Sequence, residues 1–390
     1  MPVINRIADF HDDMTAWRRD IHAHPETAFE ENRTANVVAE KLESFGVPVH
    51  RGLAKTGVVG SLKVGGSSKA IGLRADLDAL NLQEKNDFDY KSKHEGKMHA
   101  CGHDGHTTML LGAARYLAET RNFDGAVHFI FQPAEEGEAG GKAMVDEGLF
   151  QQFPCEAVYG MHNWPGMPRG MIGVRSGAMM ASADMFTIRI QGRGGHGAMP
   201  HHAVDPVVVG AQIVNALQTI ASRTIDPLDS IVVSVTQFHS GTAHNVIPDT
   251  AELSGTCRAL SPEGRKIIEW RMKETAEGIA AAHGARVEVN YRHNYPVLVN
   301  SADETQRAAK AAAKVVGDHQ VMLDPPPVMG SEDFAFMLEA KPGSYVWIGN
   351  GVGEEGGCMV HNPHYDFSDD ILPVGASYWA TLVEQELPRT

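Results

Sequence analysis

The chain has 390 residues, of which 43% are hydrophobic, and its formal net charge is −15. This length supports one large or two medium domains, and the acidic balance argues against nucleic-acid and membrane-surface partners, which need basic patches on the protein. The sequence has no run of about 18 apolar residues, no apolar leader at its N-terminus and only four scattered cysteines, so we expect a cytoplasmic protein without a disulfide framework.

The first part of the chain alternates patterns typical of helices and strands. Gly46 follows the second predicted helix directly, as the glycine that often ends a helix does. Alternating helices and strands indicate an α/β domain with a largely buried sheet. Helices are predicted over residues 4–21 and 30–45, after His106 and near 143–150, and strands over 56–64, 69–80, 125–131 and 156–164.

A different order of elements begins near residue 184. Asp205-Pro206 and Ser261-Pro262 each pair an N-cap side chain with a proline at the first helical position, so each predicts a helix start. The resulting order, β-α-β-β-α-β, is that of a ferredoxin-like domain. We therefore expect residues 184–297 to be inserted into a first domain made of 1–183 and 298–390. The first domain would resume with a helix over 301–316, a strand over 344–350 and a final helix from Ser368.

Four places outside the predicted insertion combine metal-binding side chains with a loop or a strand end. Taken alone, a single histidine among 20 is usually a surface or core residue, and adjacent glutamates are usually a solvated pair. Together the four places favour a metal centre, because ligands often lie at the carboxyl ends of strands in α/β sheets. They are Cys101 and His103 in ACGHDGH (100–106), Glu135 and Glu136 in QPAEEGE (132–138), His162 in YGMHNWP (159–165) and His361 in GGCMVHNPHYDF (356–367).

The stretch GRGGHG (192–197) formally matches the dinucleotide-binding pattern G-x-G-x-x-G. The next predicted helix begins only near Pro206, so no helix N-terminus would face a pyrophosphate, and we reject that interpretation. The simple alternative is that this stretch is only a glycine-rich loop following an edge strand. The sequence also contains no G-x-S-x-G elbow and no Walker motif, which disfavours serine hydrolases and P-loop proteins.

Read as an ordered set, eight motifs resemble the metal-dependent aminoacylase and carboxypeptidase family, in its hippurate hydrolase and indole-3-acetyl-amino-acid hydrolase branch. The resemblance spans nearly the whole chain. It implies an α/β catalytic domain interrupted by a ferredoxin-like lid that also dimerises, and amide hydrolysis at a two-metal centre. The motifs are RADLDAL, GKMHACGHDGHTTMLLGAA, FQPAEEGEAGGKAM, GMHNWP, GGHGAMPHHAVDPV, HNVIPDTAELSGTCR, GSEDFAF and HNPHYDF.

The resemblance also implies roles for individual residues. Cys101 would be a bridging thiolate and Glu135 the general base. Many relatives have His-x-Asp where this chain reads Arg74-Ala75-Asp76, and His103 would replace that missing ligand. The remaining implied ligands are Glu136, His162 and His361, with Asp76 or Asp78 orienting a ligand imidazole.

The predicted insertion would contribute to the same site. By resemblance, His196 would face the oxyanion with help from Asn245, and Gly330 would be a substrate-binding position. Arg258 would grip the substrate carboxylate with two hydrogen bonds, although an ordinary strand-face charge explains it equally well.

A thiolate bridge with imidazoles favours zinc over magnesium or calcium, while the carboxylate and imidazoles equally allow manganese, nickel or cobalt. The sequence therefore predicts two divalent metal ions and hydrolysis of N-acyl amino acids, with hippurate as the type, by a homodimer or tetramer. The alternatives are a dipeptidase or an N-acetyl or N-succinyl deacylase on the same site, and, from another class, a non-catalytic ligand-binding relative. The acyl group and the amino acid preferred are not indicated.

Overall fold

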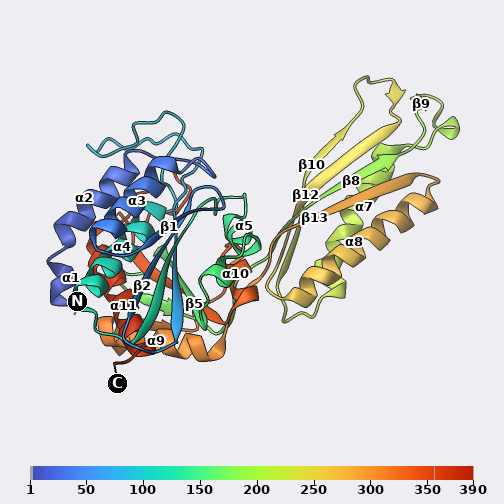
Figure 1. Cartoon of the computed structure of the whole chain (residues 1–390). Coiled ribbons are helices and arrows are strands. Elements are labelled where there is room, and N and C mark those ends of the chain that lie inside the picture. Colours follow the sequence, from blue (N-terminus) through green and yellow to red (C-terminus); the bar gives the residue numbers. More distant parts are fainter. Residues whose placement is uncertain (1–2, 355, 390) are drawn as a thin grey trace. The chain divides into compact units, whose positions relative to one another are not determined.

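The computed structural model describes residues 3–354 and 356–389, which form two compact units. The first unit runs from the N-terminus to Gly177 and also contains Val299–Pro326 and the chain from Asp333 onward. The second unit consists of Ala178–Leu298 and Pro327–Glu332. Figure 1 follows the chain through both units by colour.

The first unit is built on an eight-stranded mixed sheet in the order β1-β2-β4-β3-β5-β16-β6-β15. The central pairs β4–β3, β3–β5 and β5–β16 are parallel, so their carboxyl ends lie at one edge of the sheet. These strands are buried along nearly their whole length, as expected for a sheet covered on both faces. The strands are β1 (Val49–Leu53), β2 (Gly57–Val64), β3 (Ala70–Asp76), β4 (Gly125–Gln132), β5 (Ala157–Pro165), β6 (Ile172–Val174), β15 (Val321–Leu323) and β16 (Gly343–Gly351).

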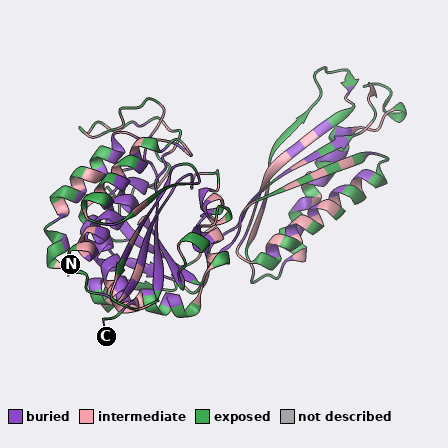
Figure 2. Ribbon diagram, in the orientation of Figure 1, coloured by how far each residue is buried: buried purple, intermediate pink, exposed green. Residues whose placement is uncertain are grey.

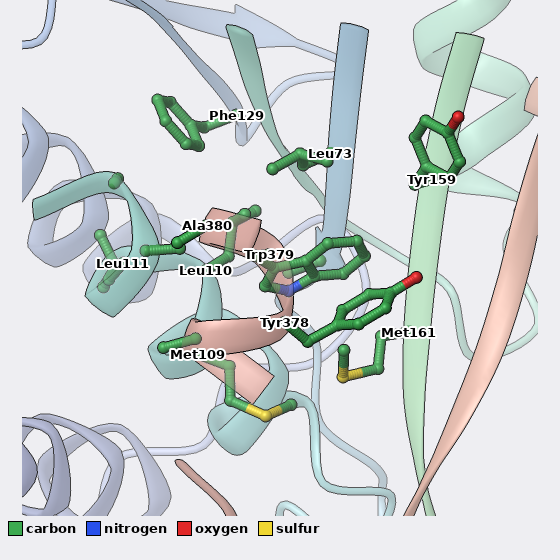
Figure 3. Close-up of a cluster of buried hydrophobic side chains, with 14 of the residues drawn as sticks. Leu73, Met109, Leu110, Leu111, Phe129, Tyr159, Met161, Tyr378, Trp379 and Ala380 are labelled. Atoms are coloured by element: carbon green, nitrogen blue, oxygen red, sulfur yellow. The ribbon is translucent and has the colours of Figure 1, made fainter. Parts of the chain in front are cut away.

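Helices of the first unit pack on this sheet and on one another. A Cβ at Gly375 would lie 2.0 Å from Met109 Sδ, so glycine at this position permits the close approach of two core helices, α11 and α4. Figure 3 shows the apolar side chains that these two helices bury beside β3, β4 and β5. The helices are α1 (Asn5–Ala8), α2 (His11–His22), α3 (Asn32–Ser44), α4 (His103–Thr120), α5 (Gly140–Asp146), α6 (Leu149–Gln152), α9 (Ala302–Val316), α10 (Ala335–Ala340) and α11 (Leu372–Glu386), with short 3₁₀ turns at Asp318–Gln320 and Asp369–Ile371.

The second unit has a four-stranded antiparallel sheet in the order β10-β12-β8-β13. This order and the two helices between its strands confirm the predicted ferredoxin-like topology. Helices α7 and α8 cover one face of the sheet, and buried residues alternate with less buried ones along the two central strands, β8 and β12 (Figure 2). The elements are β8 (Ala183–Gln191), β9 (Gly195–His196), α7 (Pro206–Thr219), a π-helical turn (Ile220–Thr224), β10 (Ile231–Ser240), β11 (Val246–Ile247), β12 (Thr250–Ala259), α8 (Pro262–Ala282) and β13 (Arg286–Tyr295), with a 3₁₀ turn at Pro200–His202. The short strands β7 (Gly177–Met180) and β14 (Leu298–Asn300), where the chain passes from one unit to the other, form a pair of their own.

Both predicted helix starts in the second unit are confirmed. The Asp205 carboxylate accepts hydrogen bonds from the amides of Val207 and Val208, and the Ser261 hydroxyl accepts one from the amide of Gly264. Each cap satisfies amides that the first turn of a helix leaves without a partner.

Several predicted boundaries are wrong. The helix over 4–21 is two helices with a break at Asp9 and Phe10, the helix near 143–150 is also two, and α4 begins at His103 rather than after His106. Residues 178–183, Leu298 and Pro327–Glu332 belong to the second unit, where Ala181 donates its amide to the carbonyls of Val328 and Gly330. Short strands such as β6 and β15 offer too few residues for a periodic pattern. Within the described chain, no helix combines the length and the hydropathy needed to cross a bilayer.

Candidate metal centre and active site

The five predicted ligands all belong to the first unit and come from four segments. Cys101 lies just before α4, and His103 is the first residue of that helix. Glu136 follows β4, His162 lies within β5, and His361 lies in the loop after β16. Because β4, β5 and β16 end at the same edge of the sheet, these segments meet there.

The structure brings the five side chains together in two overlapping groups. Cys101, His103 and His162 offer ligand atoms that all lie within 4.8 Å of one another, and so do Cys101, Glu136 and His361. Both groups contain the Cys101 sulfur. The Cys101 Sγ lies 3.3 Å from His162 Nε2, and His361 Nε2 lies 3.1 Å from Glu136 Oε1. Two groups with one sulfur in common suit two ions that share a bridging thiolate.

Two buried side-chain atoms of the predicted ligands also favour a bound cation. His103 Nε2 and Glu136 Oε1 are buried and lie 4.0 Å apart, and neither makes a well-directed hydrogen bond among the described residues, although His361 Nε2 lies 3.1 Å from Glu136 Oε1. That distance is too long for a hydrogen bond, yet it suits two donors that each lie about 2.0–2.2 Å from one zinc-like ion. A buried polar atom without a partner is costly, and a metal ion would satisfy both atoms.

The pKa shifts of the predicted ligands also favour a bound cation. Burial and the nearby Glu136 carboxylate raise the pKa of the Cys101 thiol, so a cation is needed to hold it as a thiolate. Burial and the neighbouring His106 lower the pKa of His162, which leaves a neutral imidazole able to bind a metal. Burial also lowers the pKa of His103, but Asp76, Asp78 and Glu136 outweigh it and raise that pKa to about 10. The negative charge around His103 therefore favours a cation.

The two aspartates predicted to orient a ligand imidazole lie in different positions. Asp78 Oδ1 is 3.3 Å from His103 Nδ1, and the other Asp78 oxygen accepts the amide of Glu136 at 2.9 Å. Asp78 therefore contacts two ligand-bearing segments. Asp76 instead binds His106 Nδ1 at 2.6 Å and pairs with the buried Arg74 at 2.7 Å.

His106 belongs to the same histidine-rich stretch as His103 but is used differently. Its Nδ1 contacts Asp76 at 2.6 Å, and its Nε2 accepts the amide of Asn163 at 2.9 Å. Both ring nitrogens are occupied by protein groups, so His106 has no free lone pair for a metal.

Glu135 is buried beside the ligands. Atoms of His103, Glu135 and Glu136 that could bind a metal lie within 4.8 Å of one another. The backbone turns sharply here: Ala134 and Gly137 both have positive φ angles, and the Ala134 amide is held by the Glu31 carboxylate at 2.9 Å. This irregular turn lets adjacent glutamates approach one site, whereas in an extended strand they would point to opposite faces.

The four predicted residues of the second unit fall into two separate pairs. His196 is exposed in β9 opposite Val246, and the adjacent Gly197 donates its amide to the Asn245 carbonyl at 2.8 Å. Arg258, near the end of β12, donates to the Ser331 hydroxyl at 3.0 Å, next to Gly330.

The length of β12 separates these two pairs within one chain. Asn245 precedes the first residue of this strand, Thr250, and Arg258 is its ninth residue. At about 3.3 Å per residue, Thr250 and Arg258 alone are roughly 26 Å apart. The structure therefore brings His196 near Asn245 and Arg258 near Gly330, but it does not bring all four together.

Two buried residues of the centre were not among the predicted site residues. Asn163 follows the ligand His162, and Tyr365 lies four residues after His361. Both lie inside the histidine-containing motifs GMHNWP and HNPHYDF. A polar residue beside a ligand in a buried strand is the signal that could have found Asn163.

Comparison with known proteins agrees with this geometry. The sequence profile described as "Peptidase family M20/M25/M40" matches residues 72–385. Hippurate hydrolase from Campylobacter jejuni is 44% identical over 98% of both chains. N-acyl-L-amino acid amidohydrolase from Geobacillus stearothermophilus is 45% identical over 76% of this chain and 80% of its own. The crystal structure of a dinuclear metal-binding M20-family peptidase from Bacillus subtilis matches with a TM-score of 0.85 and 36% identity, covering 97% of this chain and 99% of that one. The chain therefore belongs to peptidase family M20/M25/M40 and is a metal-dependent amidohydrolase.

Proposed function

We propose that this amidohydrolase cleaves the amide bond of N-acyl amino acids of the hippurate type, releasing a carboxylate and a free amino acid, at a centre of two divalent ions. The observation that carries the proposal is the pair of ligand groups that share Cys101, with the buried Glu135 beside them. The names of the related hippurate hydrolase and N-acyl-L-amino acid amidohydrolase support the same substrate class.

In this proposal Cys101, His103, Glu136, His162 and His361 hold the ions. When bound, two such ions would lower the pKa of an attacking water and polarise the substrate carbonyl. Glu135 accepts the proton of that water and transfers it to the departing nitrogen. Of the adjacent pair Glu135 and Glu136, only Glu136 is assigned as a metal ligand, so the Glu135 carboxylate can act as the base. The neutral imidazole of His162 and the thiol of Cys101 favour zinc, and manganese, nickel or cobalt would also suit the carboxylate and imidazoles.

We further propose that residues 184–297 act as a lid and pair two chains, in a homodimer or a tetramer. Strand β10 is an edge of the four-stranded sheet, and its residues 236–240 are exposed. The roughly 26 Å between the ends of β12 exceeds the length of a small N-acyl amino acid. His196 and Asn245 would thus serve one active site, and Arg258 and Gly330 the other.

The direct test is release of free amine from hippurate, followed with ninhydrin before and after treatment with a chelator. The proposal requires release that disappears with the chelator and returns with zinc or manganese. A panel of N-benzoyl, N-acetyl and N-succinyl amino acids and dipeptides, assayed side by side, separates the hippurate-type enzyme from a deacylase or a dipeptidase. Failure to release amine from any of them, with metal present, would favour a non-catalytic ligand-binding relative.

A further inference from the structure

The side chain and backbone of Asn163 connect three of the four ligand-bearing segments. The side chain is fully buried, and its Nδ2 donates to the Cys101 carbonyl at 2.6 Å. The backbone carbonyl of Asn163 accepts a hydrogen bond from His162 Nδ1 at 2.6 Å. With Nδ1 committed as a donor, a neutral His162 presents the lone pair of Nε2 toward the Cys101 sulfur.

Tyr365 connects the third ligand-bearing segment, which contains His361, to Asn163. Its hydroxyl donates to Asn163 Oδ1 at 2.7 Å, and the ring is fully buried. Four residues earlier, the backbone amide of His361 donates to the Ala100 carbonyl at 2.7 Å. His361 has a positive φ of 63°, so its backbone is held in a costly conformation that surrounding contacts must maintain. The His361 segment is therefore tied to the Cys101 segment directly at one point, His361 to Ala100, and indirectly at a second, through Tyr365 and Asn163.

Gly102 makes room for these contacts. It has a φ of 95°, and a Cβ at this position would lie 2.2 Å from Asn163 Nδ2 and 2.5 Å from the Tyr365 hydroxyl. Any other residue between the two ligands Cys101 and His103 would push the hydrogen-bonded pair away. The Cys-Gly-His order thus serves the packing of Asn163 and Tyr365 as well as the turn of the backbone.

From these contacts we infer that Asn163 and Tyr365 are positioning residues that set the spacing of Cys101, His162 and His361 for metal binding. The inference rests on the proposed two-metal centre. Neither side chain is assigned as a ligand: both act through the backbone and the ring orientation of residues that are. Groups that orient metal ligands in this way commonly change metal affinity by about 10–100-fold when they are removed.

The test compares two buried tyrosines of the same unit. Tyr365→Phe deletes the hydroxyl that holds Asn163. Tyr378→Phe is the matched control, because the Tyr378 hydroxyl is buried without a hydrogen-bond partner in the part of the chain that the structure describes, and it lies in the apolar core (Figure 3). Zinc affinity of the full-length metal-free proteins is measured by competition with a chromophoric chelator. We expect affinity to fall about 10–100-fold for Tyr365→Phe and to remain unchanged for Tyr378→Phe.

A double-mutant cycle separates positioning from general loss of structure. In an Asn163→Ala background the Tyr365 hydroxyl has lost its acceptor, so Tyr365→Phe should have little further effect on zinc affinity. Visible spectra of the cobalt-loaded proteins give an independent readout, since the ligand-field bands should shift for Tyr365→Phe only. Wild-type affinity and spectrum in Tyr365→Phe would overturn the inference, as would an equal loss in both backgrounds. If the wild-type protein itself binds no zinc, the two-metal proposal fails first and this inference falls with it.

Discussion

The metal-binding cluster of the first unit and the candidate substrate residues of the second are held in different ways. In the first unit, Cys101, His103 and His162 are buried, and hydrogen bonds from non-ligand residues fix their segments. In the second unit, His196 and Asn245 are exposed, His196 in the two-stranded pair of β9 and β11 and Asn245 just before β11. The comparison teaches that contacts within one chain place the candidate ligands Cys101, His103 and His162, whereas His196 and Asn245 lie at the exposed surface of the second unit.

The largest effect is expected from replacing Glu135, the proposed general base in the first unit. Glu135→Gln keeps the shape of the side chain but removes the proton acceptor, so kcat should fall by about 10²–10⁴-fold while the metal content stays at the wild-type level. Steady-state kinetics and metal analysis of the same preparation check this. Glu138→Gln, an exposed residue of the same turn, is the control and should remain active. Loss of metal in Glu135→Gln would show that Glu135 is a ligand.

The second prediction addresses His196, which is exposed in the strand pair β9–β11. His196→Ala should lower kcat by about 10²–10³-fold, the cost of one oxyanion donor. If His196 acts on the partner's site, mixing His196→Ala with Glu135→Gln should restore roughly a quarter of wild-type activity, because about half of the dimers are mixed and each has one intact site. The measurement is activity after verified subunit exchange, with His201→Ala as the control. Absence of recovery would mean that His196 acts within its own chain or not at all.

A smaller effect on catalysis is expected from replacing Arg258, near the C-terminal end of β12. Arg258→Lys keeps the charge but loses the planar fork that can bind a carboxylate through two hydrogen bonds. We expect KM for an N-acyl amino acid to rise about tenfold with kcat nearly unchanged. A KM equal to that of the wild type would favour the simpler explanation, an ordinary charge on the strand.

The smallest effect concerns stability rather than catalysis. Burial lowers the pKa of His22, but its hydrogen bonds to Asp104 and Glu84 outweigh this and raise the pKa to about 9. Since this pKa lies above the ordinary histidine value of 6.5, His22 contributes stability that is complete below pH 6.5 and is lost as the pH rises through 9.

Melting temperatures measured from pH 6 to 10 should therefore fall through this window in the wild type and fall less in His22→Gln. The matched control is His293→Gln in the second unit, because His293 is half exposed and solvent screens its ion pair with Glu269. That variant should keep the wild-type pH dependence. An unchanged slope in His22→Gln would assign the pH dependence to other groups.

The sequence predicted the elements whose signals are local. Asp205-Pro206 and Ser261-Pro262 began helices as expected, because a side-chain cap and a proline act within one turn. The five predicted metal ligands meet in one cluster because the segments that carry them lie at the edge of the sheet where the parallel strands end. They are Cys101, His103, Glu136, His162 and His361.

What the sequence did not predict depends on contacts between distant segments. The start of α4 at His103 follows Gly102, which has a left-handed conformation and lies too close to Asn163 and Tyr365 to carry a side chain. The role of Asn163 depends on a hydroxyl 202 positions away, and no periodicity reports such a contact. For the same reason the short strands β6 and β15 exist only through their partners in the sheet.

The return of Pro327–Glu332 to the second unit bears on how such proteins can be recombined. This segment gives the second unit two backbone acceptors for Ala181, and Val328 donates to the Met179 carbonyl, although some thirty residues of the first unit lie between it and Leu298. A graft that moves only residues 178–298 into a relative would leave these bonds to whatever sequence the host supplies. A unit built in this way should therefore be exchanged between enzymes as two matched pieces rather than as one cassette.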